Sequence, residues 1–296
     1  MLKRLLLLAV LSALFAIAAA CGGGETIEIG AQTYTETKIM AYINQALIED
    51  RTDYSVNVTP DIAASPPVID ALSTGELDIG LLYTGEIFNN HFPGVEDTHD
   101  PEEVLRQAQE GFNEHYDFNW FDPLGWENTY AMTVRKDVAE ELGLEKISDL
   151  KDVAENMRLG VDTTWLEREI DGYPAFIEHY GFSFGEEYSM DINLVYEAVA
   201  NEEVDIVLAY STDPRILEFD LQMLEDDQQF FPPYDACIVA RNETLEQYPE
   251  LEDILTLLTG EIDEETITRL NYEVDIEQRN PQDVAREFLQ EKGLLE

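Results

Sequence analysis

Two short stretches of the chain, 76–86 and 203–213, share one pattern of apolar and polar positions. Both read E-x-D-I-x-L-x-Y-[ST]-x-[ED], so that an acidic start leads into a short apolar run that ends at a tyrosine. A segment with helix-like spacing of apolar residues precedes each of them, at 66–75 and at 193–202. Short apolar runs bounded by polar residues are typical of buried strands. The pattern therefore predicts two copies of a helix followed by a strand.

A second pair of similar segments lies upstream of the first. Residues 27–47 read as a β-branched strand, a polar turn and an amphipathic helix, and residues 157–177 begin in the same way. The matching glycines of this pair, Gly30 and Gly160, are 130 residues apart, and the tyrosines that end the repeated strands are 127 apart. Two markers that share nearly one offset favour two similar α/β lobes. Ligands of such lobes bind beyond the carboxyl ends of the parallel strands, where the tyrosines stand.

Two further segments are candidates for the connections between the lobes. Residues 125–143 read as a strand that runs into a helix, and residues 226–245 contain a Pro-Pro break before another apolar run. The tail, 246–296, has a helical pattern and is expected to return to the first lobe. The predicted fold is α/β, with two lobes joined by two crossover segments and a ligand site in the cleft. The predicted first lobe is 25–128 plus 235–296, and the second is 129–234.

The first 24 residues predict export. Residues 1–20 have a basic start, an apolar middle and a small-residue end, which is the pattern of a secretory signal peptide. Cys21 follows directly and precedes three glycines, as in a bacterial lipobox, although Ala18 stands where leucine is usual. We expect residues 21–24 to be a lipidated cysteine and its spacer, which would anchor the protein to the outer face of the cell membrane. An ordinary signal peptide cleaved near Ala20 is the alternative.

The charge of the chain excludes some partners. Its net charge is −46, and the acidic residues are spread along the whole length. Nucleic acid and anionic lipid surfaces repel such a protein. Dense like charge is tolerable at high salt, which screens the repulsion, so we expect the fold to gain stability as salt is added. After Cys21 the only other cysteine is Cys237, so no disulfide within the exported chain is expected, and this thiol is predicted to be buried.

No catalytic or metal-binding motif is evident in the sequence. It contains no G-x-S-x-G, H-E-x-x-H, Walker A or C-x-x-C pattern. The four histidines, His91, His99, His115 and His179, lack the spacing of metal ligands. Carboxylates are so common that no local pair of them is informative. We therefore expect no cofactor and no enzymatic activity, with a carboxylate-dependent extracytoplasmic hydrolase as the alternative.

Tyrosines give the clearer chemical signal. Tyr83, Tyr130, Tyr210 and Tyr234 each stand where a strand or crossover meets the predicted cleft, flanked by small or polar residues. Aromatic faces attract cations, at roughly 0.5–2 kcal/mol per ring. A box of several rings suits a quaternary ammonium, which has no N–H to donate. Taken singly, a tyrosine at a strand end is more often a half-buried packing residue, and only the shared placement favours the cage.

Longer motifs resemble one known family. The stretches IGAQTYTETKIMAYI, VTPDIAASPPVIDAL, LYTGEIFNNHF, ENTYAMTVRKDVA, LGVDTTWLERE, VLAYSTD and EDDQQFFPPYDA are similar to those of the osmoprotectant-binding lipoproteins of ABC importers. This is the glycine betaine/carnitine/choline group, called the OpuC or QAT type, and the resemblance covers nearly all of the chain after residue 24. It implies a type II periplasmic-binding-protein fold. It also implies a receptor, expected to be a monomer, that delivers its ligand to a membrane permease with a cytoplasmic ATPase.

The resemblance also implies roles for single residues. The family's cage around the trimethylammonium group matches Tyr83, Tyr130, Tyr210 and Tyr234, and Gln32 matches the residue that holds the other end of the ligand. Glu86 stands where the family varies between small hydroxyl and acidic residues, a position linked to ligand range. A carboxylate pointing inward there would favour choline over ligands that carry their own carboxylate. A Glu86 that faces solvent or caps the following helix is the alternative.

Other residues near the predicted cleft receive weaker interpretations. Tyr34 and Trp165 follow the first strand of each lobe and are expected to be packing residues. Asp162 and Thr163 mirror Gln32 and its neighbour through the repeat alone. An amino-acid receptor of similar fold is a further alternative, and it would want an arginine for the ligand carboxylate. Arg135 and Arg215 are the candidates for that role, although each is expected to form a surface or hinge ion pair instead.

Overall fold

A computed structural model describes residues 26–295 except 97, 163–164 and 167–171. The predicted signal peptide, the predicted lipidation site Cys21 with its spacer, and Thr163 lie outside these residues. Within the described part of the chain, no helix is both long and apolar enough to cross a membrane.

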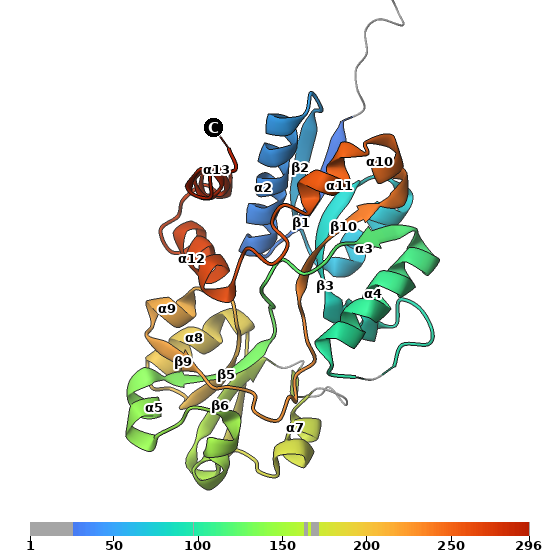
Figure 1. Cartoon of the computed structure of the whole chain (residues 1–296). Coiled ribbons are helices and arrows are strands. Elements are labelled where there is room, and N and C mark those ends of the chain that lie inside the picture. The colour runs from blue at the N-terminus through green and yellow to red at the C-terminus, as the bar shows by residue number, and fades with distance from the viewer. Residues whose placement is uncertain (1–25, 97, 163–164, 167–171, 296) are drawn as a thin grey trace, which may run out of the picture.

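Two five-stranded sheets form the frame of the molecule (Figure 1). The first has the order β2-β1-β3-β10-β4, with the bounds β1 Ile27–Gln32, β2 Val56–Ile62, β3 Ile79–Tyr83, β4 Phe118–Trp120 and β10 Ala236–Arg241. The second has the order β7-β6-β8-β5-β9, with the bounds β5 Tyr130–Arg135, β6 Arg158–Asp162, β7 Glu186–Met190, β8 Ile206–Tyr210 and β9 Leu221–Met223. The two orders match position by position, which confirms the predicted α/β fold with two lobes.

The repeated motif has the same structural role in both sheets. In each, the motif's strand lies parallel to the first strand of its lobe, β3 beside β1 and β8 beside β6. The aspartate of the motif binds the start of that neighbour. Asp78 Oδ2 accepts a hydrogen bond from the Glu28 backbone nitrogen at 2.9 Å, and Asp205 Oδ2 accepts one from the Arg158 backbone nitrogen at 2.8 Å. The aspartate therefore fixes how the two central strands of each lobe are aligned.

The chain crosses between the lobes twice. Beyond the first crossing, β5 lies antiparallel to β8 in the second sheet, and beyond the second, β10 lies antiparallel to β3 in the first sheet. The two crossovers run side by side, because Glu127 and Asp235 form an antiparallel bridge. The Asn128 backbone nitrogen also donates to the Tyr234 carbonyl at 3.0 Å. The exact lobe boundaries at 128/129 and 234/235 stay a prediction.

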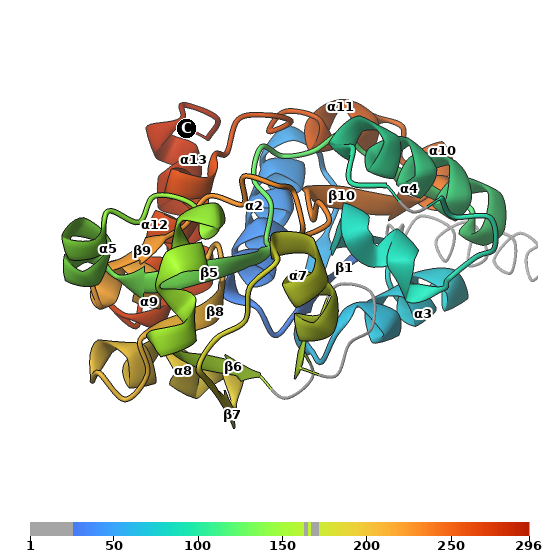
Figure 2. The ribbon, with the colours of Figure 1, turned by 90° about the horizontal axis from the view of Figure 1, so that it is seen from below.

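Helices cover both faces of each sheet, and Figure 2 shows α3, α4 and α10 of the first lobe lying away from α5, α8 and α9 of the second. The first-lobe helices are α2 Thr35–Arg51, α3 Ser65–Thr74, α4 Pro101–Tyr116, α10 Asn242–Gln247, α11 Glu250–Leu255, α12 Glu264–Asp275 and α13 Pro281–Glu291. Those of the second lobe are α5 Lys136–Leu142, α7 Tyr173–Tyr180, α8 Ile192–Ala200 and α9 Arg215–Glu218. Short 3₁₀ turns span Thr84–Asn89, Ile147–Asp152 and Ala154–Asn156.

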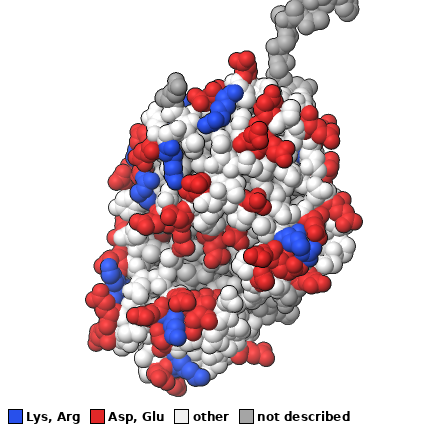
Figure 3. Space-filling view, viewed as in Figure 1, with Lys and Arg blue, Asp and Glu red and all other residues white. Residues whose placement is uncertain are grey.

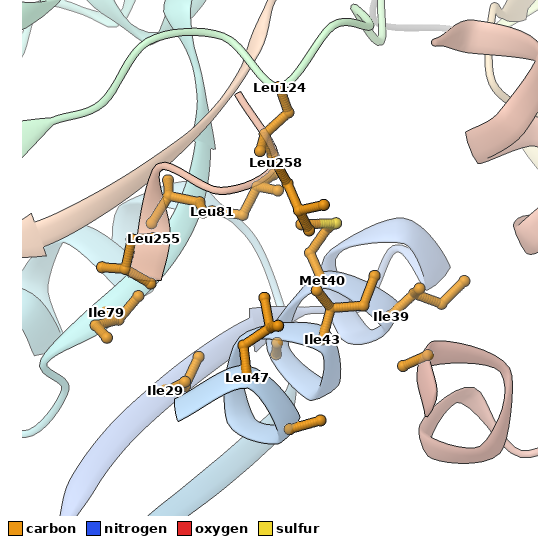
Figure 4. Close-up of a cluster of buried hydrophobic side chains, with 14 of the residues drawn as sticks. Ile29, Ile39, Met40, Ile43, Leu47, Ile79, Leu81, Leu124, Leu255 and Leu258 are labelled. Carbon is orange, nitrogen blue, oxygen red and sulfur yellow. The ribbon is translucent and has the colours of Figure 1, made fainter. Parts of the chain in front are cut away.

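The alternating strand residues give the first lobe two cores. Leu81 of β3 packs on the side of α2, α11, α12 and α13, whereas its neighbour Leu82 packs on the side of α3 and α4. Figure 4 shows the first of these cores, where Met40, Ile43 and Leu47 of α2 meet the sheet. The tail returns to this lobe as predicted. Cys237 is buried in the second core, as predicted, and burial raises the pKa of its thiol.

The second lobe has a more aromatic core. Trp165, Phe176, Phe230 and Phe231 pack together on one face of its sheet, and Trp165 is fully buried. The prediction that Trp165 is a packing residue is therefore confirmed. On the outside, Figure 3 shows acidic side chains over the whole visible face, with basic ones scattered among them. On this face the acidic residues cover the folded surface and are not gathered in one tail.

Candidate ligand-binding pocket between the lobes

A pocket of about 280 Å³ lies between the two lobes at the ends of β1, β3, β5 and β8. Its lining residues are Gln32, Tyr34, Ala64, Ser65, Pro66, Tyr83, Glu86, Asn89, Asn128, Thr129, Tyr130, Tyr210 and Tyr234. The volume is near the lower limit for small-molecule sites, so the pocket suits a compact ligand.

All six residues that the sequence predicts for the site line this one pocket, namely Gln32, Tyr83, Glu86, Tyr130, Tyr210 and Tyr234. Their contact with a ligand stays a prediction. The expectation that Tyr34 is a packing residue is wrong. Its side chain is 42% exposed, lines the pocket and lies edge-on to Tyr210, with 6.3 Å between ring centroids. The sequence places Tyr34 after β1 but does not show that the second lobe leaves its ring uncovered.

The second-lobe wall is an aromatic stack. Tyr130 and Tyr210 are directly paired across the antiparallel strands β5 and β8, and their rings are stacked, 5.3 Å apart with 18° between the planes. Phe231 supports Tyr130 from the core side at 5.9 Å. Burial, followed by the neighbouring phenols of Tyr130 and Tyr34, raises the pKa of Tyr210. The phenol therefore stays neutral, and the wall presents uncharged rings.

The hydroxyl residue after each motif tyrosine holds a crossover segment. Thr84 donates its backbone N–H to the Asp235 carbonyl at 3.0 Å, and its Oγ1 accepts from the Asp235 nitrogen at 3.0 Å. Ser211 does the same with Thr129, at 3.0 Å and 3.2 Å. In each lobe the motif therefore fastens the segment that arrives from the other lobe. This shared function explains why the sequence contains the Tyr-[Ser/Thr] pair twice.

A glycine lets the fourth tyrosine approach. A Cβ atom at Gly85 would lie 2.5 Å from the ring of Tyr234, closer than any real Cβ contact. Tyr234 lies on the second crossover, so the missing side chain at Gly85 allows the crossover to pack its ring against the 3₁₀ turn that follows β3. The Tyr-Thr-Gly-Glu segment thus positions two of the lining tyrosines.

The first-lobe wall is polar. Gln32 is buried, with its Nε2 donating to the Leu81 carbonyl at 3.3 Å and its Oε1 accepting from Ser65 Oγ at 3.4 Å. Glu86 is buried too, so the alternative in which it faces solvent is wrong. Its Oε2 accepts from Asn89 Nδ2 at 2.9 Å and lies 3.2 Å from His91 Nε2. Burial acts to raise the pKa of Glu86, but hydrogen bonds from His91, Ser65 and Asn89 outweigh it and lower the pKa.

Behind this wall lies a carboxylate that the sequence reasoning missed. Glu36 is 2% exposed and accepts a hydrogen bond from the Tyr83 hydroxyl. It also accepts from Asn128 Nδ2 at 2.8 Å and from Asn271 Nδ2 at 3.1 Å. Burial first, and then the charge of Glu36, raise the pKa of Tyr83, so its phenol stays protonated. In the sequence Glu36 is simply an acid in the first turn of a helix, which the helix dipole alone explains.

No lysine or arginine is among the residues found to line the pocket. Arg215 instead binds Asp213, with its Nε donating to Oδ1 at 2.8 Å, and Arg135 donates to the Val199 carbonyl at 3.0 Å. Asp162 accepts from the Trp165 nitrogen at 3.0 Å and is not part of the lining. Among the described residues, no group of histidine, cysteine and acidic side chains could hold a metal ion.

Comparison with known proteins identifies the family. The family model described as the substrate binding domain of ABC-type glycine betaine transport systems matches residues 25–291. The chain belongs to this family. The predicted resemblance is thereby confirmed, and so is the predicted function of a substrate-binding component of an ABC importer. Members of the family are substrate-binding proteins of transporters and act outside the cytoplasm.

Relatives and solved structures agree with the family model. The carnitine transport binding protein OpuCC of Listeria monocytogenes is 39% identical over 92% of this chain and 88% of its own length. A glycine-betaine-binding protein of Pseudomonas aeruginosa is 34% identical over 94% of this chain and 92% of its own. A crystal structure of a glycine betaine/carnitine/choline ABC transporter protein superimposes with a TM-score of 0.86 at 38% identity, covering 91% of this chain and all of the other.

Proposed function

We propose that this member of the family captures a quaternary ammonium solute in the pocket between its lobes. The ligand class is that of glycine betaine, carnitine and choline, with the rings of Tyr83, Tyr130, Tyr210 and Tyr234 around the methylated nitrogen and Gln32 at the other end. One observation carries the proposal: the described lining contains five tyrosines and a buried carboxylate but no lysine or arginine. Such a pocket attracts a cation that needs no hydrogen-bond acceptor.

The magnitudes support useful affinity. Four or five rings at roughly 0.5–2 kcal/mol each, with the burial of the methyl groups, reach the range of about −8 kcal/mol that corresponds to a micromolar Kd. The ligand would contact Tyr83 in the first lobe and Tyr210 in the second. Because binding to both walls is possible only when the lobes are close together, the ligand favours the closed state.

Glu86 narrows the choice of ligand. Its carboxylate lies in the wall and is ionised at neutral pH, because its pKa is lowered. Carnitine and glycine betaine carry a carboxylate that Glu86 would repel. Choline instead carries a hydroxyl, which can donate a hydrogen bond to Glu86. We therefore propose choline as the preferred ligand. The alternative of an amino-acid receptor is disfavoured by the positions of Arg135 and Arg215, which are not part of the lining.

We further propose that the receptor is held at the outer face of the cell membrane through lipidated Cys21. As a monomer, it would pass the closed, loaded form to a permease with a cytoplasmic ATPase. It needs no cofactor and leaves the ligand chemically unchanged.

Calorimetric titration of the chain from residue 25 onward tests the proposal. Choline, carnitine and glycine betaine are compared with proline and glutamate, which represent amino acids. Stoichiometric binding of choline, tighter than that of carnitine and with no binding of the amino acids, is the expected result. Recovery of unchanged choline by NMR after incubation separates a receptor from a hydrolase. Binding of an amino acid but of no quaternary ammonium would overturn the proposed function.

A further inference from the structure

Glu36 is a buried carboxylate without a basic partner in the described part of the chain. It lies in the first turn of α2, is 2% exposed and does not itself line the pocket. No lysine, arginine or histidine among the described residues pairs with it; its partners there are the phenol of Tyr83 and the amides of Asn128 and Asn271. Burial of a charge is costly unless another charge compensates it. The helix N-terminus offsets part of this cost.

The hydrogen-bond pattern is that of an ionised carboxylate. Oε1 accepts from Tyr83 and Asn128, and Oε2 accepts from Asn271, so both oxygens act as acceptors. An ionised carboxylate only accepts, and so it matches these three donors. Two of the donors, Tyr83 and Asn128, are themselves lining residues. The charge is therefore separated from the pocket by a single layer of side chains.

On the basis of the proposed function, we infer that Glu36 is the hidden counter-charge of the ligand and selects for a cation through Tyr83. The ligand nitrogen and the carboxylate would lie on opposite sides of the same phenol. A hydroxyl that donates to an anion makes its ring more electron-rich, and this strengthens the attraction between the ring and a cation. In a pocket shielded from water the direct attraction between the two charges is also only weakly screened.

The charge of Glu36 also acts on a second lining residue. After burial, the charges of Glu36 and then Glu86 are what raise the pKa of Tyr34, which stands in the lining. Glu86 differs from Glu36 in having His91 beside it, at 3.2 Å. Among the described residues Glu36 has only neutral hydrogen-bond donors around it, so apart from the helix N-terminus no positive group beside it offsets its charge.

The same carboxylate also joins the two lobes. Asn271 of α12 donates both to Glu36 and, at 3.1 Å, to the Thr212 carbonyl directly after the second-lobe motif. A purely structural role for Glu36, as an acceptor that organises Tyr83 and this link, is therefore the rival interpretation. The two roles are separable, because a glutamine at this position loses the charge but keeps the carbonyl oxygen that Tyr83 and Asn128 need. Its NH2 group can donate to Asn271 Oδ1, which has no hydrogen-bond partner among the described residues, once the Asn271 carboxamide turns.

The test compares the E36Q variant with the parent chain on two ligands of one shape. In 3,3-dimethyl-1-butanol a carbon atom replaces the charged nitrogen of choline, so the analogue has the same shape but is neutral. We expect E36Q to weaken choline binding by about tenfold and to change binding of the neutral analogue by less than about twofold. The matched control is E49Q, the same change of acid to amide at an exposed position of the same helix. It should leave both affinities unchanged.

Two further measurements keep the outcomes distinct. Because the variant no longer buries a charge, the ligand-free E36Q protein should melt no lower than its parent, while the rise in Tm that choline causes should shrink. The loss should also persist at molar salt, which screens the surface acids. Equal weakening of both ligands would overturn the inference in favour of the structural role, and so would unchanged choline binding. If the parent chain binds no quaternary ammonium at all, the proposed function fails instead.

Discussion

The two walls of the pocket come from the same strand motif but differ in charge. At the last position of the motif, Glu86 in the first lobe is buried in the wall with Asn89 and His91 beside it. Its counterpart in the second lobe, Asp213, is bound by the guanidinium of Arg215 and does not line the pocket. The first wall is therefore anionic and polar, whereas the second is neutral and aromatic.

This difference shows which parts of a repeat are free to vary. The aspartate that fixes the strands and the hydroxyl that fastens the crossover serve the fold, and both lobes keep them. The acid three residues after the tyrosine does not serve the fold in the same way. In the first lobe this acid is part of the pocket lining, whereas in the second it is half of an ion pair with Arg215. The repeat thus supplies a symmetric frame in which charge is distributed asymmetrically.

The largest expected effect is the loss of the aromatic wall. Tyr210→Ala removes the ring that contacts both Tyr130 and Tyr34, and it should weaken choline binding by about tenfold or more in calorimetric titration. Tyr130→Ala should have a similar effect. Tyr188→Ala is the matched control, since it removes an exposed tyrosine of the same lobe that does not line the pocket. Unchanged affinity in both pocket variants would remove the second wall from the binding site.

The repeated acid gives the next largest effect and tests the charge difference directly. Glu86→Gln should shift the ratio of choline to carnitine affinity towards carnitine by about fivefold, because repulsion of the carnitine carboxylate is relieved. Asp213→Asn should leave that ratio unchanged and instead lower the free energy of unfolding by about 1–2 kcal/mol, because Arg215 loses a charged partner. Denaturant unfolding measures the second effect. A change of ratio in the Asp213 variant would contradict the asymmetry of the walls.

Tyr34 offers a smaller effect that tests how the walls meet. It stands on the first lobe but contacts Tyr210 of the second, so its ring links the two walls of the pocket. Tyr34→Ala should weaken choline binding by about threefold, and Tyr34→Phe by less, because phenylalanine keeps the edge-on contact. Titration of the pair of variants separates ring from hydroxyl. Equal losses in the two variants would show that the hydroxyl, which both of them lack, is what matters.

The smallest expected effect concerns Glu127, which lies on the first crossover between the two lobes. Burial, followed by the charges of nearby acids such as Asp235, raises the pKa of Glu127 on the first crossover despite a hydrogen bond from the Tyr234 nitrogen. A raised pKa means that the folded state binds this proton more tightly, so stability is lost as the pH rises through the folded-state value. Glu127→Gln should therefore raise Tm by about 1–2 °C at neutral pH.

Acid removes this difference. Below about pH 3.5 Glu127 is protonated in the folded and the unfolded state, so the Tm of the Glu127→Gln variant and that of the parent should coincide. Scanning calorimetry at both pH values checks this. The exposed Glu49→Gln change serves as the control and should show no such crossing. A Tm gain of equal size at both pH values would mean that charge is not the cause.

The frame of the molecule was predictable because its signals are local. The motif, the glycines Gly30 and Gly160 and the tyrosines stand at fixed offsets, and each marks a short element that can be read from adjacent residues. These signals were enough to predict two lobes, the return of the tail and the gathering of Tyr83 and Tyr210 at one place. They do not predict which of the two walls is anionic. That difference comes from Arg215, which follows the second copy of the motif and has no counterpart after the first.

The rest depends on contacts between segments far apart in the sequence. Glu36 and Asn271 are 235 residues apart, and only the packing of α12 against α2 brings them together. The exposure of Tyr34 likewise depends on how much of its ring the second lobe covers. Neither residue type is unusual at its position, since acids are favoured in the first turn of helices and aromatic residues at strand ends. Local patterns therefore cannot separate these two residues from ordinary ones.

The place of β10 sets the order in which the two lobes can be completed during synthesis. This strand follows the whole second lobe in the chain, yet it lies between β3 and β4 in the first sheet, and among the described residues β4 pairs with no other strand. Until Ala236–Arg241 has emerged, the older lobe keeps an open edge and an unattached strand. The lobe that begins the chain is thus completed only after the other lobe has been made.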